Sequence, residues 1–538
     1  MKQTAVTLYD TTMRDGAQAE GVSFSGSGKI EMAKRLDEFG IDYIEGGYAG
    51  SNPKDMEFFR TVRRIGLRHA KVVAFGSTRR AGRKVGEDPF VRSLLDAQTP
   101  VVTVVGKTWD LHVRDVLRTT AEENLAMIAE TVGFLKDHGR KVFFDAEHFF
   151  DGWKASTDFA FGALQAAVDA GADALVLCDT NGGSLPHEIY AATRQVVERC
   201  RTPVGIHCHN DAGLAVANTL EAVRAGATHV QGTVNGYGER CGNADLVTII
   251  PNLQIKMQRR VISAESMKRL RELSVFVGDL LNVRPDPKAP YVGQSAFGHN
   301  AGLHVNAVHK NPRTFEHVRP EVVGNKRRVI MSELSGGSSV LLKAIELGLG
   351  RKQAAEGARE ILGVLKELEG KGYAFEAADA SFRLLIQKVL KKHKAFFDLE
   401  GFRVIVEKRG KNEPCLSEAT IKVRVKDEIE QTVAEGDGPV NALDTALRKA
   451  LTRFYPEIAK VLLTDFRVRI LDPKEATAAI TRVLIESSDG TETWGTVGVS
   501  ENIIEASWQA LVDSVEYKLF RAEELARRKR RKTGARKG

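Results

Sequence analysis

Two histidines separated by a single residue, His207 and His209, end a short apolar segment at residues 204–209. The segment predicts a β-strand, in which successive side chains point to opposite faces. We therefore expect both imidazoles on one face and Cys208 on the other. Two such histidines, with a carboxylate from another strand end, can hold a divalent metal ion and leave positions open for a substrate. The alternative is a pair of hydrogen-bonded structural histidines.

Asp15 is the carboxylate that we expect beside them, because it follows the first strand-like segment of the chain. Two histidines and one carboxylate, without cysteine, suit manganese, magnesium, zinc or cobalt. An ion held in this way would polarise a carbonyl group and stabilise an alkoxide formed by attack on it. Arg14 could pair with negative charge in the same pocket.

Further polar residues stand where strand-like segments end, namely Asp10, Glu45, Glu147, Asp179, Thr180, Asn235 and Glu239. A single residue of this kind would mean little. Together with the histidines of the seventh segment, such residues stand at six segments. This recurrence indicates one shared site, because a barrel of parallel strands gathers its chemistry at the carboxyl ends of those strands.

The elements that must position these residues occupy the first half of the chain. Eight strand-like segments alternate with stretches of helical spacing, at residues 6–11, 43–47, 71–75, 101–105, 141–147, 174–180, 204–209 and 230–235. This order predicts a (β/α)8 TIM barrel, in which the first and eighth strands close the ring near the seventh. An open doubly wound sheet is the rival, but Gly26-Ser-Gly-Lys29 lacks the spacing of a phosphate-binding loop, and Ile30 replaces its Ser or Thr.

The pattern changes after residue 265, and residues 284–290 form a proline-rich linker. We expect a catalytic barrel at 1–265, mostly helical linker subdomains at 266–400, and an α+β domain at 401–525. That last domain has predicted strands at 402–408, 419–425, 466–471 and 478–487. Helices are predicted at 338–347, 353–368, 441–454 and 502–524.

A second group of polar residues lies past the barrel, where His299 and His304 stand among glycine and asparagine. Such a segment is usually an exposed loop. It could instead be a lid that supplies a general acid or base. The residues alone leave both interpretations open.

Composition sets the remaining limits. The chain has 538 residues, 43% hydrophobic and 28% charged, and contains no run of apolar residues long enough for a membrane helix. We also expect no signal peptide, because a strand-like segment begins within the first residues. Its five scattered cysteines argue against a disulfide framework, so we expect a cytoplasmic protein with reduced thiols. The formal charge of +8 equals the eight basic residues of 527–538, so we expect a disordered basic tail at 526–538 rather than a nucleic-acid-binding surface.

The motifs resemble a known family. Residues 10–18 (DTTMRDGAQ) resemble the opening motif of the DRE-TIM metallolyases, which include 2-isopropylmalate, homocitrate and citramalate synthases. Residues 205–218 and 235–244 resemble the two signature segments of these synthases, and residues 299–308 resemble their linker histidine motif. The C-terminal domain resembles their regulatory domain. The resemblance therefore covers nearly the whole chain.

Three further segments, at 45–55, 145–152 and 332–336, are most similar to the (R)-citramalate synthase group. This resemblance implies a Claisen condensation of acetyl-CoA with pyruvate in isoleucine biosynthesis. It also implies a homodimer whose C-terminal domain binds a feedback amino acid, isoleucine if the pathway assignment holds.

Carried over by position, the resemblance implies that Asp15, His207 and His209 bind the metal, with Asn243 in or near the coordination shell. It further implies roles in catalysis or substrate binding for Arg14 and Thr180 at the oxo acid, Glu147 at the acetyl methyl proton, and His304 as an acid/base residue from the partner subunit.

The sequence is also compatible with other substrates and activities. The same chemistry on 2-oxoisovalerate or 2-oxoglutarate would make the chain a 2-isopropylmalate or homocitrate synthase. Val104 and Phe144 are predicted apolar walls of a methyl-sized pocket that would favour pyruvate. Phe315 stands where many relatives have tyrosine. A carbon–carbon lyase of the same superfamily and a non-catalytic amino-acid sensor are more distant alternatives.

Overall fold

The computed structural model describes residues 4–50, 52–299, 302–330, 337–346, 351–471 and 479–534. The similarity noted at residues 332–336 therefore lies outside the described residues, as does the end of the basic tail. Contacts divide the chain into two compact units, Met1–Phe297 with Val318–Arg327, and Gly298–His317 with Arg328–Gly538.

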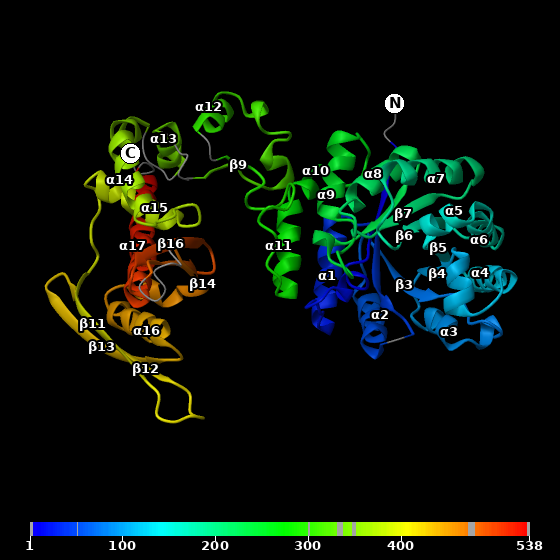
Figure 1. Cartoon of the computed structure of the whole chain (residues 1–538), viewed down its shortest axis with the longest axis horizontal. Coiled ribbons are helices and arrows are strands. Elements are labelled where there is room, and N and C mark those ends of the chain that lie inside the picture. The colour runs from blue at the N-terminus through cyan, green and yellow to red at the C-terminus, as the bar shows by residue number, and fades with distance from the viewer. Residues whose placement is uncertain are drawn as a thin grey trace. The chain divides into compact units, whose positions relative to one another are not determined.

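The first unit is a closed barrel of eight parallel strands, which confirms the predicted fold (Figure 1). The strands follow one another around the ring in sequence order: β1 (Thr7–Asp10), β2 (Tyr43–Tyr48), β3 (Lys71–Ser77), β4 (Val101–Lys107), β5 (Lys141–Glu147), β6 (Ala174–Asp179), β7 (Val204–Cys208) and β8 (His229–Gly232). Pairing of Asp10 with Gly232 between β1 and β8 closes the ring.

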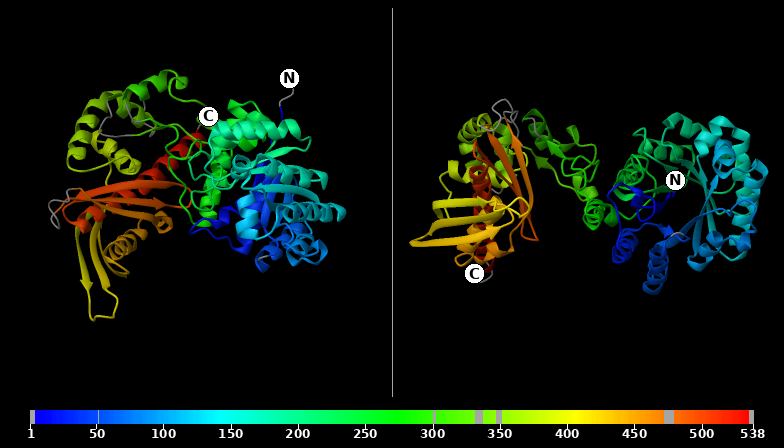
Figure 2. Two further views of the ribbon diagram at one scale, coloured as in Figure 1. Left: turned by 45° about the vertical axis from the view of Figure 1, so that its right-hand side comes forward. Right: turned by 60° about the horizontal axis from the view of Figure 1, so that its bottom comes forward.

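Helices surround the barrel, as the blue-to-green part of Figure 2 shows. They are α1 (Gly26–Phe39), α2 (Pro53–Ile65), α3 (Pro89–Asp96), α4 (Ala121–Asp137), α5 (Phe149–Ala155), α6 (Thr157–Asp169), α7 (Pro186–Arg199), α8 (Ala215–Ala225), α9 (Leu246–Pro251), α10 (Ala264–Met267) and α11 (Leu270–Leu281). Helix α1 begins at Gly26 with Ser25 as its N-cap, so the glycines at 26–28 form a helix start rather than a phosphate loop.

Strand alternation divides the buried side chains of the barrel into an inner and an outer layer. The inner layer is aromatic at its centre, where Tyr9, Tyr43, Val73, Val101, Phe143 and Ala174 form one cluster. The outer layer packs against the helices and includes Val104 and Phe144. The predicted role of these two residues as pocket walls is wrong, because their neighbours Val105 and Asp145 are the ones that face the cavity.

The second unit contains two three-stranded antiparallel sheets, each covered by a helix (Figure 2). Helix α16 (Pro439–Thr452) packs on the sheet of β11 (Asp398–Glu407), β12 (Leu416–Val425) and β13 (Glu428–Gly436). Helix α17 (Ile503–Gly534) packs on the sheet of β14 (Leu462–Ile470), β15 (Thr481–Ser488) and β16 (Thr493–Ser500). Apolar residues of α16, α17, β12 and β15 form a shared core. Helix α17 ends at Gly534, so the prediction of a disordered tail at 526–538 is wrong for residues 526–534.

The rest of this unit is mostly helical. It comprises a two-residue pair, β9 (Gly298–His299) with β10 (Arg328–Val329), and helices α12 (Gly302–Lys310), α13 (Gly337–Glu346), α14 (Arg351–Gly370) and α15 (Asp379–Val389). No helix among the described residues has both the length and the apolar character needed to cross a membrane.

Candidate active site

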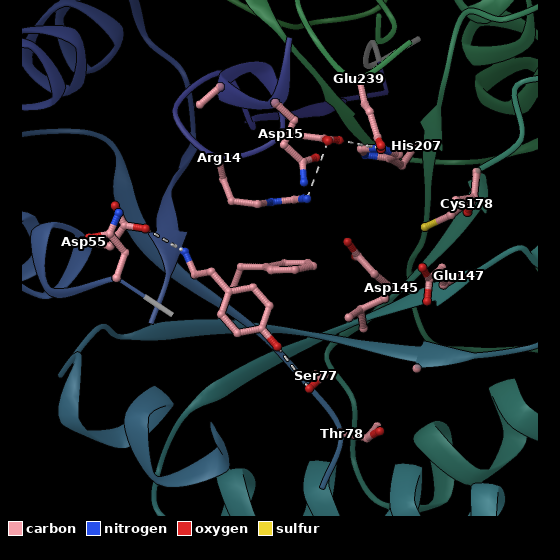
Figure 3. Close-up of a pocket in the computed structure, with 18 of the residues that line it drawn as sticks. Arg14, Asp15, Asp55, Ser77, Thr78, Asp145, Glu147, Cys178, His207 and Glu239 are labelled. Atoms are coloured by element: carbon pink, nitrogen blue, oxygen red, sulfur yellow. Dashed lines mark hydrogen bonds and ion pairs between the residues drawn. The ribbon is translucent and has the colours of Figure 1, made fainter. Parts of the chain in front are cut away.

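A cavity of about 990 Å³ opens at the carboxyl ends of the barrel strands. Its lining includes Arg14 and Asp15 after β1, Asp145 and Glu147 on β5, Thr180 after β6, His207 on β7 and His209 just after it. The cavity lies between Arg14 on one side and Asp145 with Glu147 on the other (Figure 3). The barrel thus brings together residues that are far apart in the sequence.

Asp15, His207 and His209 form the one group of potential metal ligands found in the described part of the chain. The Oδ2 atom of Asp15 lies 3.2 Å from His207 Nε2 and 3.8 Å from His209 Nε2. The two Nε2 atoms lie 3.3 Å apart. Neighbouring ligands of an octahedral ion with metal–ligand distances near 2.1 Å are about 3.0 Å apart. The three atoms therefore converge as ligands of a divalent ion would.

The protonation of Asp15 fits this donor set. Burial alone would raise the pKa of Asp15, but the adjacent Arg14 and His207 hold that pKa well below its usual range. The carboxylate is therefore charged at neutral pH, as a metal ligand must be.

Asn243 lies next to this group, because it forms an isolated antiparallel bridge with His209. Its side-chain Oδ1 is buried, and no hydrogen-bond partner for it exists among the described residues. A buried carbonyl oxygen without a partner is costly unless another group satisfies it. An additional ligand position for a cation would do so.

Arg14 lies between two carboxylates at the wall of the cavity. Its Nε donates to Glu45 Oε2 at 2.7 Å, and its Nη1 lies 3.6 Å from Asp15 Oδ1. The guanidinium carbon is 3.9 Å from the centre of the Phe75 ring. This arrangement holds a positive charge against an apolar ring inside the pocket, where it can meet a small anionic ligand.

Glu147 and Thr180 occupy the opposite side. Glu147 forms an ion pair with Lys107, and both side chains line the cavity. The Thr180 hydroxyl accepts a hydrogen bond of 2.8 Å from the backbone N–H of His148. The hydroxyl proton therefore stays available for another acceptor.

His304 belongs to the second unit, where it is exposed on α12 and packs against Phe315 with ring centroids 4.3 Å apart. Its proposed contribution to the cavity stays a prediction. The second histidine of that segment, His299, lies 3.4 Å from Glu316. These contacts place the histidines in an ordered helix and a short strand pair, where the sequence alone left a loop as one alternative.

Several of the polar strand-end residues serve the turns rather than the cavity. Asp10 accepts hydrogen bonds from Thr12, and Asp179 accepts one from the Ser184 hydroxyl. Asn235 exchanges hydrogen bonds with Ser274 of α11. These contacts fix the loops from which the ligand residues project.

Several residues of the site were not predicted from the sequence. Asp145 lines the cavity, and burial raises its pKa to about 7. Gln231 on β8 links Asp145 to His207. The signal was present, because a glutamine within a short buried strand must find hydrogen-bond partners in the barrel. Basic residues also line the cavity: Lys29, Lys54, Arg79, Arg80, Lys107 and Arg240.

Comparisons with known proteins agree with this geometry. The HMGL-like family model matches residues 5–277, the homocitrate synthase post-HMGL domain-like model residues 291–372, and the LeuA allosteric (dimerisation) domain model residues 376–519. An (R)-citramalate synthase of Geobacter sulfurreducens is 53% identical over 97% of this chain and 98% of its own length. The chain belongs to the (R)-citramalate synthase family. This confirms the family, the enzyme class and the acyltransferase activity predicted from the sequence.

Other relatives support this placement. The (R)-citramalate synthase of Aquifex aeolicus is 53% identical over 96% of this chain and 98% of its own length. A probable 2-isopropylmalate synthase of Methanopyrus kandleri is 34% identical over 98% of this chain and 99% of its own length. The citramalate synthases are therefore the more similar group, and the alternative activity is less supported.

Proposed function

We propose that this chain joins the acetyl group of acetyl-CoA to pyruvate, forming (R)-citramalate and free CoA, with a divalent metal ion held by Asp15, His207 and His209. The observation that supports this best is the convergence of these three side chains, 3.2–3.8 Å apart, beside Arg14 in a cavity of a citramalate synthase family member. Asn243 would complete or adjoin the ligand set.

Each partner of the reaction has suitable groups in the cavity. A divalent ion held by Asp15, His207 and His209 would polarise the keto group of the oxo acid and would stabilise negative charge on its oxygen. The Arg14 guanidinium donates to the carboxylate of pyruvate, and the Thr180 hydroxyl donates to the same substrate. The Phe75 ring covers one face of the Arg14 guanidinium and shields that face from water.

The acetyl methyl group must lose a proton before it can attack. Glu147 handles this proton or orients the group that does, because its carboxylate lines the cavity and pairs there with Lys107. His304 of the partner subunit supplies a further acid/base group, which makes the homodimer the catalytic unit.

The coenzyme requires positive charge at the cavity. Lys54, Arg79, Arg80 and Arg240 line it. Arg79 is held by two glutamates, Glu123 and Glu130. Lys54, Arg80 and Arg240 are exposed, and they suit the phosphate groups of acetyl-CoA.

Regulation and assembly belong to the second unit. The LeuA allosteric (dimerisation) model matches it over residues 376–519. We infer that this domain joins two chains and binds an end-product amino acid, isoleucine for the citramalate route. Inhibition by isoleucine but not leucine would support the assignment, and the reverse result would contradict it.

The proposed reaction is tested by following free CoA thiol. Purified enzyme with acetyl-CoA and Mn²⁺ is offered pyruvate, 2-oxoisovalerate and 2-oxoglutarate in parallel. The proposal predicts preference for pyruvate and loss of turnover in His207→Ala. Preference for 2-oxoisovalerate would replace the substrate and keep the site, whereas metal-loaded, folded protein that releases no thiol would favour a sensor.

A further inference from the structure

Gln231 on β8 contacts residues of two other barrel strands, β5 and β7. It lies on β8 and is fully buried, with 0% of its surface exposed. Its Nε2 donates to Asp145 Oδ1 on β5 at 3.0 Å, and its Oε1 lies 2.9 Å from His207 Nδ1 on β7. Strands β6 and β7 separate β5 from β8 in the ring, so the side chain crosses the barrel interior.

The two ends of a carboxamide have different roles. The NH2 group can only donate, and the oxygen can only accept. Because the carboxyl oxygen of Asp145 receives the NH2 group, the oxygen of Gln231 faces His207. The Nδ1 atom of His207 must then carry a proton to form this hydrogen bond. With Nδ1 protonated, the lone pair of Nε2 points at Asp15 and His209.

A histidine that binds metal through Nε2 needs this tautomer, and the hydrogen bond at its other nitrogen selects it. His207 and His209 differ in this respect. His207 has Gln231 as its partner at Nδ1, whereas the buried Nδ1 of His209 has no hydrogen-bond partner among the described residues. The orientation of His207 is therefore determined by the barrel itself.

We propose that Gln231 is a positioning residue for the metal centre: held by Asp145, it keeps the Nε2 lone pair of His207 directed at the ion. This inference rests on the proposed metal centre. It assigns a role to two residues, Gln231 and Asp145, that contribute through His207. Loss of the Gln231 oxygen would let the imidazole rotate or change tautomer, which weakens the binding of the ion.

The test compares two variants of the full-length chain. Gln231→Met keeps a side chain of similar length and removes both polar ends. The double variant Gln231→Glu/Asp145→Asn exchanges the amide and the carboxylate, so that residue 145 donates to residue 231, which still accepts from His207. Gln195→Met, on the exposed face of α7, is the matched control.

The measurement is Mn²⁺ affinity of chelator-stripped protein without substrates, from calorimetry or from the spin-resonance signal of free Mn²⁺. We expect Gln231→Met to weaken binding by about 10–100-fold, the usual effect of removing an outer hydrogen-bond partner of a metal ligand. The exchange variant and Gln195→Met should stay within about threefold of the parent, a far smaller loss. At saturating Mn²⁺, kcat of Gln231→Met should recover.

Parent-like affinity in Gln231→Met would overturn the inference, as would an exchange variant as weak as Gln231→Met. If Gln231→Met does not fold, the exchange variant decides alone: parent-like affinity supports the role, and weakening by tenfold or more contradicts it. If the parent chain binds no Mn²⁺, or if its Mn²⁺ binding is unchanged in His207→Ala, the metal centre itself is contradicted. The two failures are therefore distinguishable.

Discussion

The Nε atom of Arg14 lies 2.7 Å from a carboxylate oxygen of Glu45, a residue with 0% of its surface exposed. Glu45 also accepts a hydrogen bond of 2.7 Å from the hydroxyl group of Tyr9. The fully buried Glu45 carboxylate thus fixes the orientation of the Arg14 guanidinium that faces the cavity. Its remaining nitrogens stay directed at Asp15 and the cavity.

Glu45→Gln is expected to lower stability and weaken oxo-acid binding together. The substitution keeps the shape but removes the charge opposite Arg14, which costs about 1–3 kcal/mol of unfolding free energy. Denaturant unfolding and the KM for pyruvate measure the two effects. Glu57→Gln changes an exposed residue of α2 and removes its surface pair with Arg60. This variant is the control and should change neither. Parent-like stability in Glu45→Gln would contradict the role of this pair.

Chelator treatment should abolish turnover, and Mn²⁺ should restore it. Binding to the folded state alone adds about 2.7 kcal/mol at a concentration of one hundred times Kd, so Tm should rise with Mn²⁺. His209→Ala should lose this shift in Tm, whereas His138→Ala, an exposed residue at the end of α4, should keep it. A Tm shift that survives in His209→Ala would show that the ion binds elsewhere.

Val105 and Val104 form a matched pair for substrate choice. Val105 lines the cavity, whereas Val104 packs in the outer core with 0% exposure. Val105→Ala enlarges the pocket, so the ratio of kcat/KM for 2-oxoisovalerate to that for pyruvate should rise by about tenfold. Val104→Ala should instead lower stability by roughly 1–3 kcal/mol and leave that ratio unchanged. If both variants keep the same selectivity, Val105 does not determine which oxo acid is preferred.

Stability should fall in acid because of His229, which is fully buried among Tyr9, Tyr43 and Phe143. Burial, with repulsion from Lys141, lowers the pKa of His229 from 6.5 to about 3. In the unfolded chain His229 binds a proton below pH 6.5, whereas in the folded chain it stays neutral down to about pH 3. Stability present above pH 6.5 is therefore lost as the pH falls through this window.

The slope of this loss approaches about 1.4 kcal/mol per pH unit for one proton. Unfolding free energy measured between pH 7.5 and roughly 5 should show it in the parent and much less in His229→Gln. His138→Gln serves as the exposed control. An unchanged slope in His229→Gln would assign the acid sensitivity to other groups.

The sequence predicted those features that depend on local periodicity. Alternation on β7 placed His207 and His209 on one face, and eight strand–helix repeats predicted the ring that brings Asp15 to them. It was harder to predict which of two successive strand residues points into the barrel. Val104 and Phe144 were assigned to the pocket, but each lies one residue out of phase with the inner face.

Contacts between side chains of different barrel strands could not be predicted from the sequence. Gln231, on β8, meets Asp145 and His207 only because the ring closes around it. In the second unit β13 was missed because its side chains are mostly exposed and rich in glutamate, so apolar alternation is weak. A two-residue turn after β12, with Lys426 at φ of 55°, brings β13 back along β12.

The most direct test of the central claim is the identity of the product. Acetyl-CoA labelled with ¹³C at the acetyl methyl carbon is incubated with pyruvate, enzyme and Mn²⁺, and the product is resolved by chiral chromatography and NMR. We expect (R)-citramalate with the label in its methylene carbon, and we expect no such product from the reaction with Asp15→Asn. Labelled acetate with free CoA, and no new carbon–carbon bond, would contradict it.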